Sequence, residues 1–382
     1  MEISVSLMKR SIIVIFLLFS VVTFANQLPC GMAMPSDTVV KESKARQFFD
    51  KIGKFADEWF MRGVDTSYLA LPKHRFKLSY LSDVGSVYTI IRCFDVPYYE
   101  NIDARMKSNV LPKMGFLVGF RNINFGYLWN LYQHYTNFKL SLTQNAFGIE
   151  LQRRQTFYAK GYIDASAIEG RLDLEAGSIA VSTTFLSGYV ALNRKRFSMP
   201  AAFNQSYVQK HSAGSVLLYA DYMYTSMAYN RDELITRTGG MHEIELYQTA
   251  LGVGYGYNYT PNGGKILMHI SGGPLLAFFN RMLVTGDSRM FLQNNNYNII
   301  FSQKIKPQYK VYVTGRIRAA FVYNINERFL LAVYGVCNNI RFRSKDTPFH
   351  TDTQVNLDYN SEVGMRLMTW DWNAVLQFGV RF

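Results

Sequence analysis

The stretch Trp372-Asn-Ala-Val-Leu-Gln-Phe-Gly-Val-Arg-Phe382 decides the fold class of this chain. Every even-numbered residue in it is apolar, whereas the odd-numbered residues include Asn373, Gln377 and Arg381. Successive side chains of a β-strand point to opposite faces of the sheet, so one face of this strand meets an apolar medium and the other a polar one. The pattern predicts a strand that crosses a membrane.

The same two-residue period continues back to Lys73. Residues 309–323 show it most clearly, with apolar residues on one face and with Lys310, Arg316 and Arg318 on the other. It recurs at 123–131 and 357–367. Counting the weaker segments, about 12 to 14 strands fit before the end of the chain. The sequence therefore predicts an all-β fold, a transmembrane antiparallel β-barrel over residues 71–382.

Turn-forming residues separate the predicted strands at 121–122, 260–264, 324–328 and 370–371. If the C-terminus is periplasmic, the turn at 370–371 is extracellular and several long loops fall in the periplasm. Barrels of this class usually show the opposite asymmetry, with short periplasmic turns and longer extracellular loops. The strand count and the sidedness of the loops therefore stay open at this point.

The composition agrees with a barrel. The chain contains 26 Tyr and 28 Phe, and its mean hydropathy is −0.05. Lipid-facing and lumen-facing residues cancel along each strand of a barrel, so a near-neutral mean is expected. Beyond the N-terminal segment, no stretch approaches the roughly 20 consecutive apolar residues of a spanning helix, which excludes a helical membrane protein.

The N-terminus predicts export to the outer membrane of a Gram-negative bacterium. Two basic residues precede an apolar run that ends near Ala25, which is the layout of a signal peptide over residues 1–25. Cleavage after Ala33 is the alternative. Residues 26–70 are predicted to be a periplasmic leader with an amphipathic helix at 41–62. We expect this helix to pack on the barrel; the alternatives are that it plugs the lumen or lies on the membrane.

The formal net charge is +13 at pH 7. In an exported protein the expected acidic partner is lipopolysaccharide phosphate, an anionic solute or a polysaccharide, and not nucleic acid. Five basic residues share the polar faces of the C-terminal strands: Lys310, Arg316, Arg318, Arg366 and Arg381. If those strands are neighbours, the lumen has a basic wall. Such a wall favours anions in an open pore; otherwise it belongs to an internal ion-pair network.

Few residues in the sequence indicate a catalytic, metal-binding or cofactor-binding role. His269 and Ser271 share one face of a predicted strand, and this pair resembles the active strand of outer-membrane lipid hydrolases. An imidazole makes a hydroxyl nucleophilic when a third group orients the base, but no acidic residue close in sequence supplies that group. We therefore expect a polar pair that faces the lumen. The cysteines, Cys30, Cys93 and Cys337, have no metal-site or disulfide spacing, and no cofactor motif is present.

The stretch Phe197-Ser-Met-Pro-Ala-Ala-Phe-Asn-Gln-Ser-Tyr-Val-Gln-Lys-His-Ser-Ala-Gly-Ser215 is the most specific motif. With Asp65-Thr-Ser-Tyr68 and the segment from 115–120 through 147–151, it resembles the Bacteroidetes family catalogued as domain of unknown function 4421. The resemblance implies an outer-membrane barrel with no assigned activity. The motif residues that we single out are Phe197, Ser198, Pro200, Ala201, Ala202, Phe203, Gln209, Ser212, Ala213, Gly214 and Ser215. Its small residues indicate close packing, so we expect an ordered loop inside the lumen, with a surface loop as the alternative.

The leading functional hypothesis is passage or binding of small anionic or amphiphilic solutes. A barrel of about 12 to 14 strands is wider than a filled eight-stranded one and narrower than an open porin. The alternatives are a lipid or envelope-modifying hydrolase that uses His269 and Ser271, and a structural or adhesive barrel. The terminal Phe382 resembles the assembly signal of such barrels, so the barrel-assembly machinery is an expected partner. A lumen filled with side chains would argue against an open channel.

Overall fold

The computed structural model describes residues 44–96, 100–110, 112–130, 135–165, 170–237, 241–287, 300–305, 307–344, 347–348 and 362–382. The predicted signal peptide, both predicted cleavage positions and Cys30 lie outside these ranges. Two compact units divide the chain, residues up to Ile52 and residues Gly53–Phe382. Helix α2 (Lys44–Met61) covers most of the helix predicted at 41–62.

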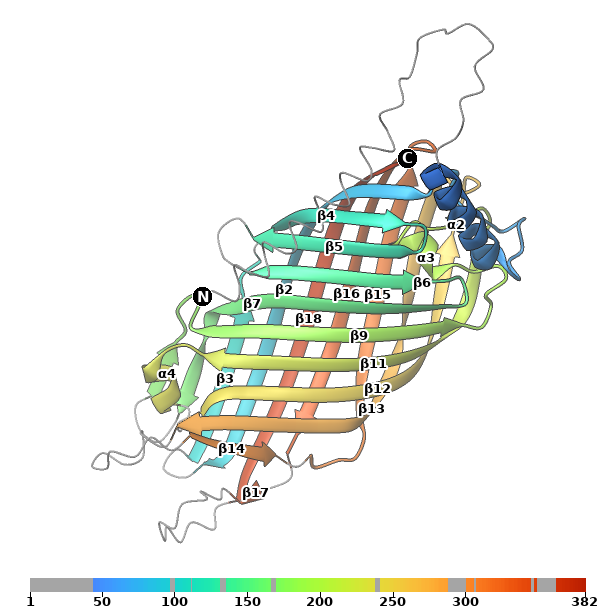
Figure 1. Cartoon of the computed structure of the whole chain (residues 1–382). Helices are drawn as coiled ribbons and strands as arrows, with labels where there is room; N and C mark the ends of the chain where they lie inside the picture. The colour runs from blue at the N-terminus through green and yellow to red at the C-terminus, as the bar shows by residue number, and fades with distance from the viewer. Residues whose placement is uncertain are drawn as a thin grey trace, which may run out of the picture. The chain divides into compact units, whose positions relative to one another are not determined.

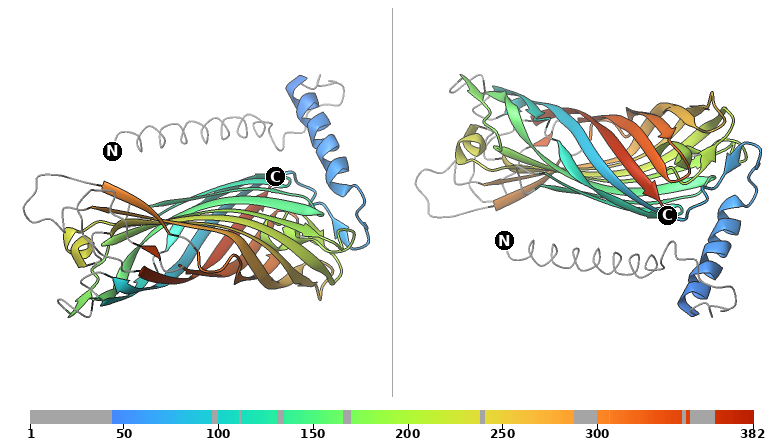
Figure 2. Two further views of the ribbon diagram at one scale, coloured as in Figure 1. Left: turned by 90° about the horizontal axis from the view of Figure 1, so that it is seen from below. Right: turned by 90° about the horizontal axis from the view of Figure 1, so that it is seen from above.

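The unit Gly53–Phe382 is a closed antiparallel β-barrel (Figure 1). Over the described residues its ring has 12 strands, and the last strand pairs with the first. In ring order they are β2 (Phe76–Val96), β4 (Lys113–Phe120), β5 (Ile123–Asn130), β6 (Thr136–Thr143), β7 (Phe147–Ala165), β9 (Ile179–Ala191), β11 (Ala213–Tyr229), β12 (Met241–Tyr259), β13 (Ile266–Asp287), β15 (Tyr312–Asn324), β16 (Phe329–Arg343) and β18 (Glu362–Arg381). The predicted fold class is confirmed. Figure 2 shows the strands running obliquely around the barrel.

Shorter elements complete the unit. Strands β3 (Glu100–Ser108), β8 (Gly170–Asp173), β14 (Ile300–Ile305) and β17 (Thr347–Pro348) pair with strands of the ring. Strands β1 (Leu69–Ala70) and β10 (Val208–Gln209) form a separate two-stranded sheet. Helices α3 (Met199–Phe203) and α4 (Asp232–Arg237) belong to the connections that precede and follow β11.

The number of strands in the wall changes part of the way along the barrel. β2 pairs with β4 up to Asp83 and with β3 from Tyr88. β7 pairs with β6 up to Arg153 and with β3 from Tyr158. The hairpin of β5 and β6 is therefore a wedge that separates β4 from β7 in one half of the barrel only. In the other half, β3 alone bridges β2 and β7.

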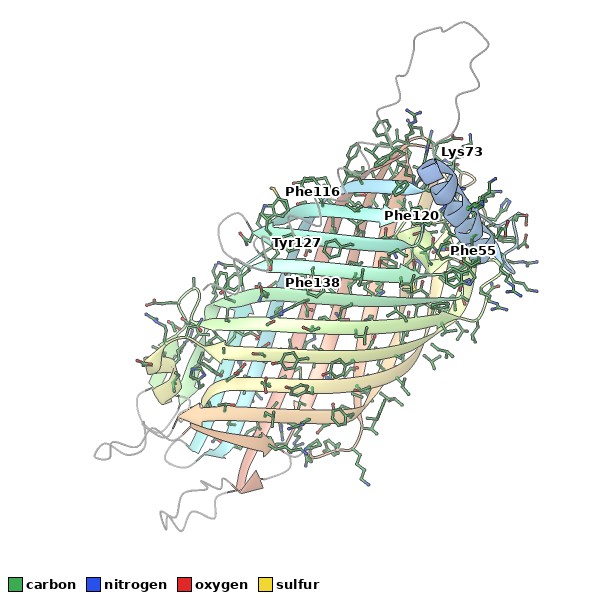
Figure 3. The ribbon with its side chains drawn as sticks, in the orientation of Figure 1. Phe55, Lys73, Phe116, Phe120, Tyr127 and Phe138 are labelled. Atoms are coloured by element: carbon green, nitrogen blue, oxygen red, sulfur yellow. The ribbon has the colours of Figure 1, made fainter. Side chains whose placement is uncertain are left out.

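The half that contains the wedge has a belt of large apolar side chains on its outer face. We call it the C-terminal half, because β18 ends there. Exposed members of the belt include Phe116, Ile149, Leu186, Leu218, Leu251, Val253, Ile270, Val313, Ile317 and Leu376. Figure 3 shows Phe116, Tyr127 and Phe138 on the neighbouring strands β4, β5 and β6. Such a belt matches the hydrocarbon layer of a membrane.

The opposite, far half has the reverse distribution of apolar and polar residues. Its lumen is packed with an apolar cluster that includes Ile163, Phe185, Ile244 and Leu367. On its outer face, Arg92 and Arg105 of β2 and β3 pair with Asp103 at 3.5 and 3.3 Å. An apolar inside and a charged outside are typical of a β-barrel in water. We infer that the far half extends beyond the membrane.

The reversal explains why the predicted turn at 370–371 is wrong. β18 is one unbroken strand across this position. Its apolar residues change face there: Leu367 is buried in the lumen, whereas Trp372 faces outward and is 39% exposed. Without the false turn, the tight connections 121–122, 144–146, 260–265 and 325–328 all lie at the end of the barrel where β18 ends. The conflict over loop sidedness is reduced to one long connection at this end, residues 192–212, which folds into the lumen; the short turns beside it are usual at one end of such barrels.

Among the described residues, no helix combines the length and the apolar character needed to span a membrane. Cys93 is buried in the far half and Cys337 is exposed; neither forms a disulfide.

Two alanines of β11 test the position of the membrane boundary. Both face outward, Ala220 in the belt and Ala228 in the far half beside Glu243. We expect Ala220→Arg to lower the free energy of unfolding by about 2–4 kcal/mol, because it places a charge in hydrocarbon. Ala228→Arg should change it by less than about 1 kcal/mol, because the site is in water. Urea unfolding in lipid vesicles measures both values, and equal losses would contradict the boundary.

Candidate functional site

The C-terminal mouth of the barrel is filled by a segment that we call the plug, residues 197–209. Every residue from 197 to 207 is buried. Ser198 caps helix α3, since its Oγ accepts a hydrogen bond from the backbone N–H of Ala201 at 3.3 Å. Ala201 and Ala202 are 3% and 0% exposed, and their small side chains let the helix pack closely against the barrel wall. The loop therefore lies inside the lumen.

The second part of the family motif, residues 65–68, clamps the plug from its outer side. The ammonium group of Lys210 donates to Thr66 O at 2.9 Å, and Arg196 pairs with Asp65 at 3.5 Å. Hydrogen bonds from the hydroxyl and the backbone N–H of Ser67 lower the pKa of Asp65. The neighbouring strand β1 pairs with β10, so Leu69 lies opposite Gln209. Two segments that are far apart in sequence thus form one structure.

Inside the barrel, a chain of hydrogen bonds joins the plug to the wall. Ser271 Oγ lies 2.8 Å from His269 Nε2, and His269 Nδ1 lies 2.6 Å from Asn258 Oδ1. Asn258 Nδ2 donates to Ser198 O at 2.8 Å and to Gln209 Oε1 at 3.0 Å. Gln209 Oε1 also accepts from the backbone N–H of Ser198 at 3.0 Å. We call these five residues the latch, because they fasten the plug to β12 and β13.

Asn258 is the member of the latch that sequence reasoning missed, and Lys77 is the buried cation of the mouth that it missed. Asn258 orients the imidazole of His269, and it comes from the neighbouring strand, opposite His269 in the register of β12 and β13. The predicted turn at 260–264 did not give this pairing, because counting outward from its centre places position 258 opposite position 266; the observed register is shifted by three residues. Ser271, His269 and Asn258 thus have the mutual distances of a nucleophile, a base and an orienting group. The rings of Phe197 and Phe203 cover His269, and Ser271 is only 2% exposed.

The other residues of the motif have structural neighbours. Pro200 lies in the first turn of α3, and Phe203 packs on Tyr334 with ring centroids 6.0 Å apart. Ser212 Oγ accepts the backbone N–H of Thr260 at 2.9 Å. Ala213, Gly214 and Ser215 begin β11, where a Cβ on Gly214 would collide with the Tyr255 hydroxyl. The motif therefore covers the plug and the strand that follows it.

Two cations lie side by side where the barrel closes. Lys77 of β2 and Arg381 of β18 are opposite each other in the register of the closing pair, and they are 5% and 4% exposed. Lys77 Nζ donates to Asn204 O and, at 3.3 Å, to Gln205 Oε1. Arg381 donates to Gln205 O at 3.3 Å and to Asn324 Oδ1 at 3.2 Å. Their main partners are thus neutral oxygen atoms of the plug.

Arg318 adds a third buried cation to this mouth. It faces the lumen from β15 and lies over the ring of Phe203, 5.7 Å from the ring centroid. Among the described residues, Lys77, Arg318 and Arg381 form no ion pair with a carboxylate. The nearby carboxylates have other partners: Asp57 pairs with Arg121 and Arg75, and Glu150 with Lys139. The C-terminal mouth therefore has an excess of buried positive charge.

A recess opens beside Lys77 and Arg381. It encloses about 240 Å³ between side chains, part of it open to solvent. Its lining includes Arg75, Arg121 and Ser206. Ser206 Oγ and Arg381 Nε are buried and have no hydrogen-bond partner among the described residues. Donors without acceptors, next to uncompensated cations, are the features of a site for an anion.

The predicted basic wall is only partly present. Arg316, Arg318 and Arg381 line the lumen. Lys310 lies before the start of β15 and is exposed, and Arg366 is exposed on the outer face of the far half, over the ring of Phe94. Arg366 was placed wrongly because the prediction assumed that the polar face of a strand always lines the lumen. That assumption fails where the lumen is apolar.

Farther along the lumen the charges are balanced. Arg316 pairs with Asp221 at 2.9 Å and donates to Asn338 at 2.9 Å. Arg154 reaches both carboxylate oxygens of Asp371 at 2.7 Å. Together with the plug at one end and the apolar cluster at the other, these pairs fill the lumen with side chains. The barrel in this state has no open channel through its described residues.

Within the described part of the chain, no group of three or more His, Cys, Asp or Glu residues is placed to hold a metal ion.

Residues 63–366 match a family described as a domain of unknown function (DUF4421). No curated protein is significantly similar in sequence. Solved structures with a similar arrangement include the outer membrane protease OmpT from Escherichia coli, with a TM-score of 0.38, 10% identity and coverage of 83% of this chain and 100% of that one. The translocator domain of autotransporter NalP from Neisseria meningitidis has a TM-score of 0.31, 10% identity and coverages of 89% and 100%. The Pseudomonas putida toluene transporter TodX has a TM-score of 0.30, 8% identity and coverages of 81% and 90%. At these identities and TM-scores the likenesses do not bear on function.

The latch predicts how the plug can be released. Asn258→Ala removes the bonds to His269, Ser198 and Gln209 and leaves buried polar groups unpaired, so it should destabilise the closed plug by about 1–3 kcal/mol. Arg196 and Lys210 flank the plug, so trypsin should cut the variant at these positions several-fold faster than the original protein. Asn230→Ala is the control, because Asn230 is exposed and bonds Gly177 O at the far end. Unchanged cleavage in Asn258→Ala would show that the latch does not hold the plug.

Proposed function

The chain belongs to this family of unknown function, and we propose that it is a barrel of a Gram-negative outer membrane that binds small anionic solutes at its C-terminal mouth. Carboxylates and phosphates are the solute groups that match the recess. The barrel is closed as it stands, so passage requires the plug to leave the mouth. The apolar belt supports the membrane location, and outer-membrane lipid and lipopolysaccharide are then its surroundings.

The observation that carries the proposal is the pairing of Lys77 with Arg381. Like charges directly opposite each other on neighbouring strands are destabilising, and burial removes the water that would screen them. Neutral carbonyl oxygens of the plug only partly compensate these charges. An anion in the recess would accept hydrogen bonds from both cations and from the unpartnered Ser206 hydroxyl. Charge-assisted hydrogen bonds of this kind are about twice as strong as neutral ones.

The same contacts suggest how binding is coupled to the plug. Asn204 O and Gln205 O accept hydrogen bonds from Lys77 and Arg381, and these are the donors that an anion would use. A bound anion therefore competes with the plug for the two cations. Once these bonds are exchanged, the plug is held by the latch and by the contacts with residues 65–69. Binding of the solute thus weakens the closed state.

Lys77→Met tests the anion site. With inorganic phosphate at about 100 times its dissociation constant, binding should stabilise the original protein by about 2.7 kcal/mol. The variant should lose most of this stabilisation, because it removes one of the two facing charges. Thermal unfolding in detergent measures the effect, with chloride at equal ionic strength as the reference salt.

Lys73→Met is the matched control for Lys77→Met. Lys73 lies at the same end of the barrel, but it is exposed and pairs with Glu327. Its replacement should leave the phosphate effect intact. Equal phosphate stabilisation in all three proteins would refute the site. Planar-bilayer recordings then test passage: the original protein should be closed, and Asn258→Ala should open with selectivity for anions.

A hydrolase is the second candidate, and the geometry of Ser271, His269 and Asn258 favours it. The two distances of 2.8 and 2.6 Å are those of an activated serine. The substrate would be an ester, such as that of a lipid. Catalysis would require the plug to move, since Phe197 and Phe203 cover the imidazole. In the closed state Ser271, His269 and Asn258 act as part of the latch.

Ser271→Ala separates the two roles. If Ser271 is a nucleophile, the variant should lose essentially all hydrolysis of a phospholipid or p-nitrophenyl ester, measured in the background of Gln209→Ala, which removes two bonds of the latch and leaves Ser271, His269 and Asn258 in place. As part of the latch, the same hydroxyl contributes only about 1 kcal/mol to stability. Hydrolysis that persists when Ser271→Ala is combined with Gln209→Ala would exclude Ser271 as the nucleophile, and its absence from both the original protein and Gln209→Ala would exclude the enzyme.

A further inference from the structure

A second recess lies in the barrel wall, at the tip of the wedge. Between Asp83 and Tyr88, β2 has lost β4 and has not yet gained β3 as its partner. On the other side of the wedge, β7 changes partner between Arg153 and Tyr158. The wall therefore has a short interval without complete strand pairing. A recess enclosing about 550 Å³ between side chains, part of it open to solvent, occupies this interval.

Side chains replace the missing backbone pairing on one edge of the interval. Ser108 Oγ accepts the backbone N–H of Val87 at 2.8 Å, and Ser86 Oγ donates to Ser108 O at 3.0 Å. Ser86 and Ser108 are 2% and 3% exposed. These side-chain hydrogen bonds stabilise the interval in which β2 lacks a backbone partner on this side.

The recess extends from the outer face of the wall to the lumen. Outward-facing residues such as Ser86 and Gln155 line it together with the lumen-facing Asp83, Arg154 and Asp371. A barrel wall with complete strand pairing separates these two sets of residues. A ligand in the recess would therefore contact the membrane side and the lumen side at once.

Charge in the recess consists of one closed pair and two single charges. Arg154 and Asp371 neutralise each other at 2.7 Å. Lys113 Nζ donates only to neutral acceptors, Asn137 Oδ1 at 3.1 Å and Gln155 O at 2.7 Å. Asp83 is 4% exposed and accepts one hydrogen bond, from Asn373 at 3.2 Å. No ion pair joins Lys113 or Asp83 to another side chain in the described residues. Lys113 and Asp83 lie opposite each other in the register of β2 and β4, so a cation and an anion without a direct ion-pair contact stand side by side in the recess.

Aromatic side chains place the recess at a membrane interface. Tyr88 and Trp370 stack beside it on the outer face, with ring centroids 5.7 Å apart. On the wedge, Trp129 lies next to Asn130, which lines the recess, and Tyr135 stacks on Phe157 at 5.6 Å. Trp and Tyr gather where barrels cross the boundary between hydrocarbon and head groups. The belt of apolar residues begins on the C-terminal side of the recess, at Phe116.

We propose that the recess binds the zwitterionic head group of an amphiphile, with its phosphate on Lys113 and its ammonium group on Asp83. A head group with both charges offers an ion-pair contact to each of these two residues, whereas a simple anion that binds Lys113 offers none to the buried carboxylate of Asp83. The acyl chains of a lipid would lie along the apolar belt outside the wall. This site is distinct from the anion recess at the C-terminal mouth and does not depend on it.

Native mass spectrometry of the purified protein in detergent tests the proposal. The probes are phosphatidylethanolamine, phosphatidylglycerol, which lacks the ammonium group, and glycerophosphoethanolamine, which lacks the chains. The original protein should bind phosphatidylethanolamine about tenfold or more tightly than phosphatidylglycerol. Lys113→Met should weaken both lipids by about tenfold or more, and Asp83→Asn should abolish the preference between them. Tighter binding of the lipid than of glycerophosphoethanolamine identifies a membrane lipid as the source, and equal binding identifies a free head group.

Lys107→Met is the matched control, since Lys107 is exposed on the outer face of β3, close to the recess. It should bind the probes as the original protein does. Heat-modifiable mobility in electrophoresis shows whether each variant is folded; if Lys113→Met does not fold, the preference test with Asp83→Asn decides alone. Equal binding of both lipids by the original protein, or unchanged preference in Asp83→Asn, would overturn the proposal.

Discussion

In hydrocarbon, a backbone N–H or C=O group without a partner costs several kcal/mol, so a sheet can lie there only when its first and last strands pair. Here β2 and β18 meet this constraint along most of their length, from the pair Lys77 and Arg381 at one end to Phe94 and Gly364 at the other. The same pairing determines which charged side chains face each other at the C-terminal mouth. It places two cations opposite each other at the mouth, where neutral oxygen atoms of the plug are their main partners. The charge that the proposed solute would neutralise is thus a consequence of closure.

The interior can be understood as three layers with different physical chemistry. At the C-terminal mouth, hydrogen bonds of the latch and from Lys77 and Arg381 hold the plug. In the middle, Arg316 with Asp221 and Arg154 with Asp371 form buried, balanced pairs. In the far half the lumen is an apolar core. A filled lumen argues against a permanently open pore, and this is why the function is assigned to binding at the mouth and to passage only after release of the plug.

Much of the fold was predictable, because a period of two residues with one apolar face has few explanations in a chain of this length. The error at 370–371 came from the assumption that the apolar face of a strand always meets lipid. β18 crosses from the membrane into water, so Leu367 turns inward while Trp372 turns outward, and a change of face looks like a turn. The latch was partly predictable: His269 and Ser271 were recognised, but the turn predicted at 260–264 implies a register that does not bring Asn258 opposite His269. The wedge was not predictable, since partner strands for β3 depend on where β5 and β6 end, and no local pattern encodes that.

The apolar cluster of the far half contains six methionines: Met106, Met223, Met227, Met241, Met282 and Met365. An unbranched thioether has several rotamers of similar energy, so it can refill space after a neighbour moves. No hydrogen bond has to be exchanged when such side chains rearrange. A molecule that travels along the lumen would therefore meet two different barriers. At the C-terminal mouth the hydrogen bonds of the latch must break, whereas in the far half methionine side chains can rearrange without breaking any.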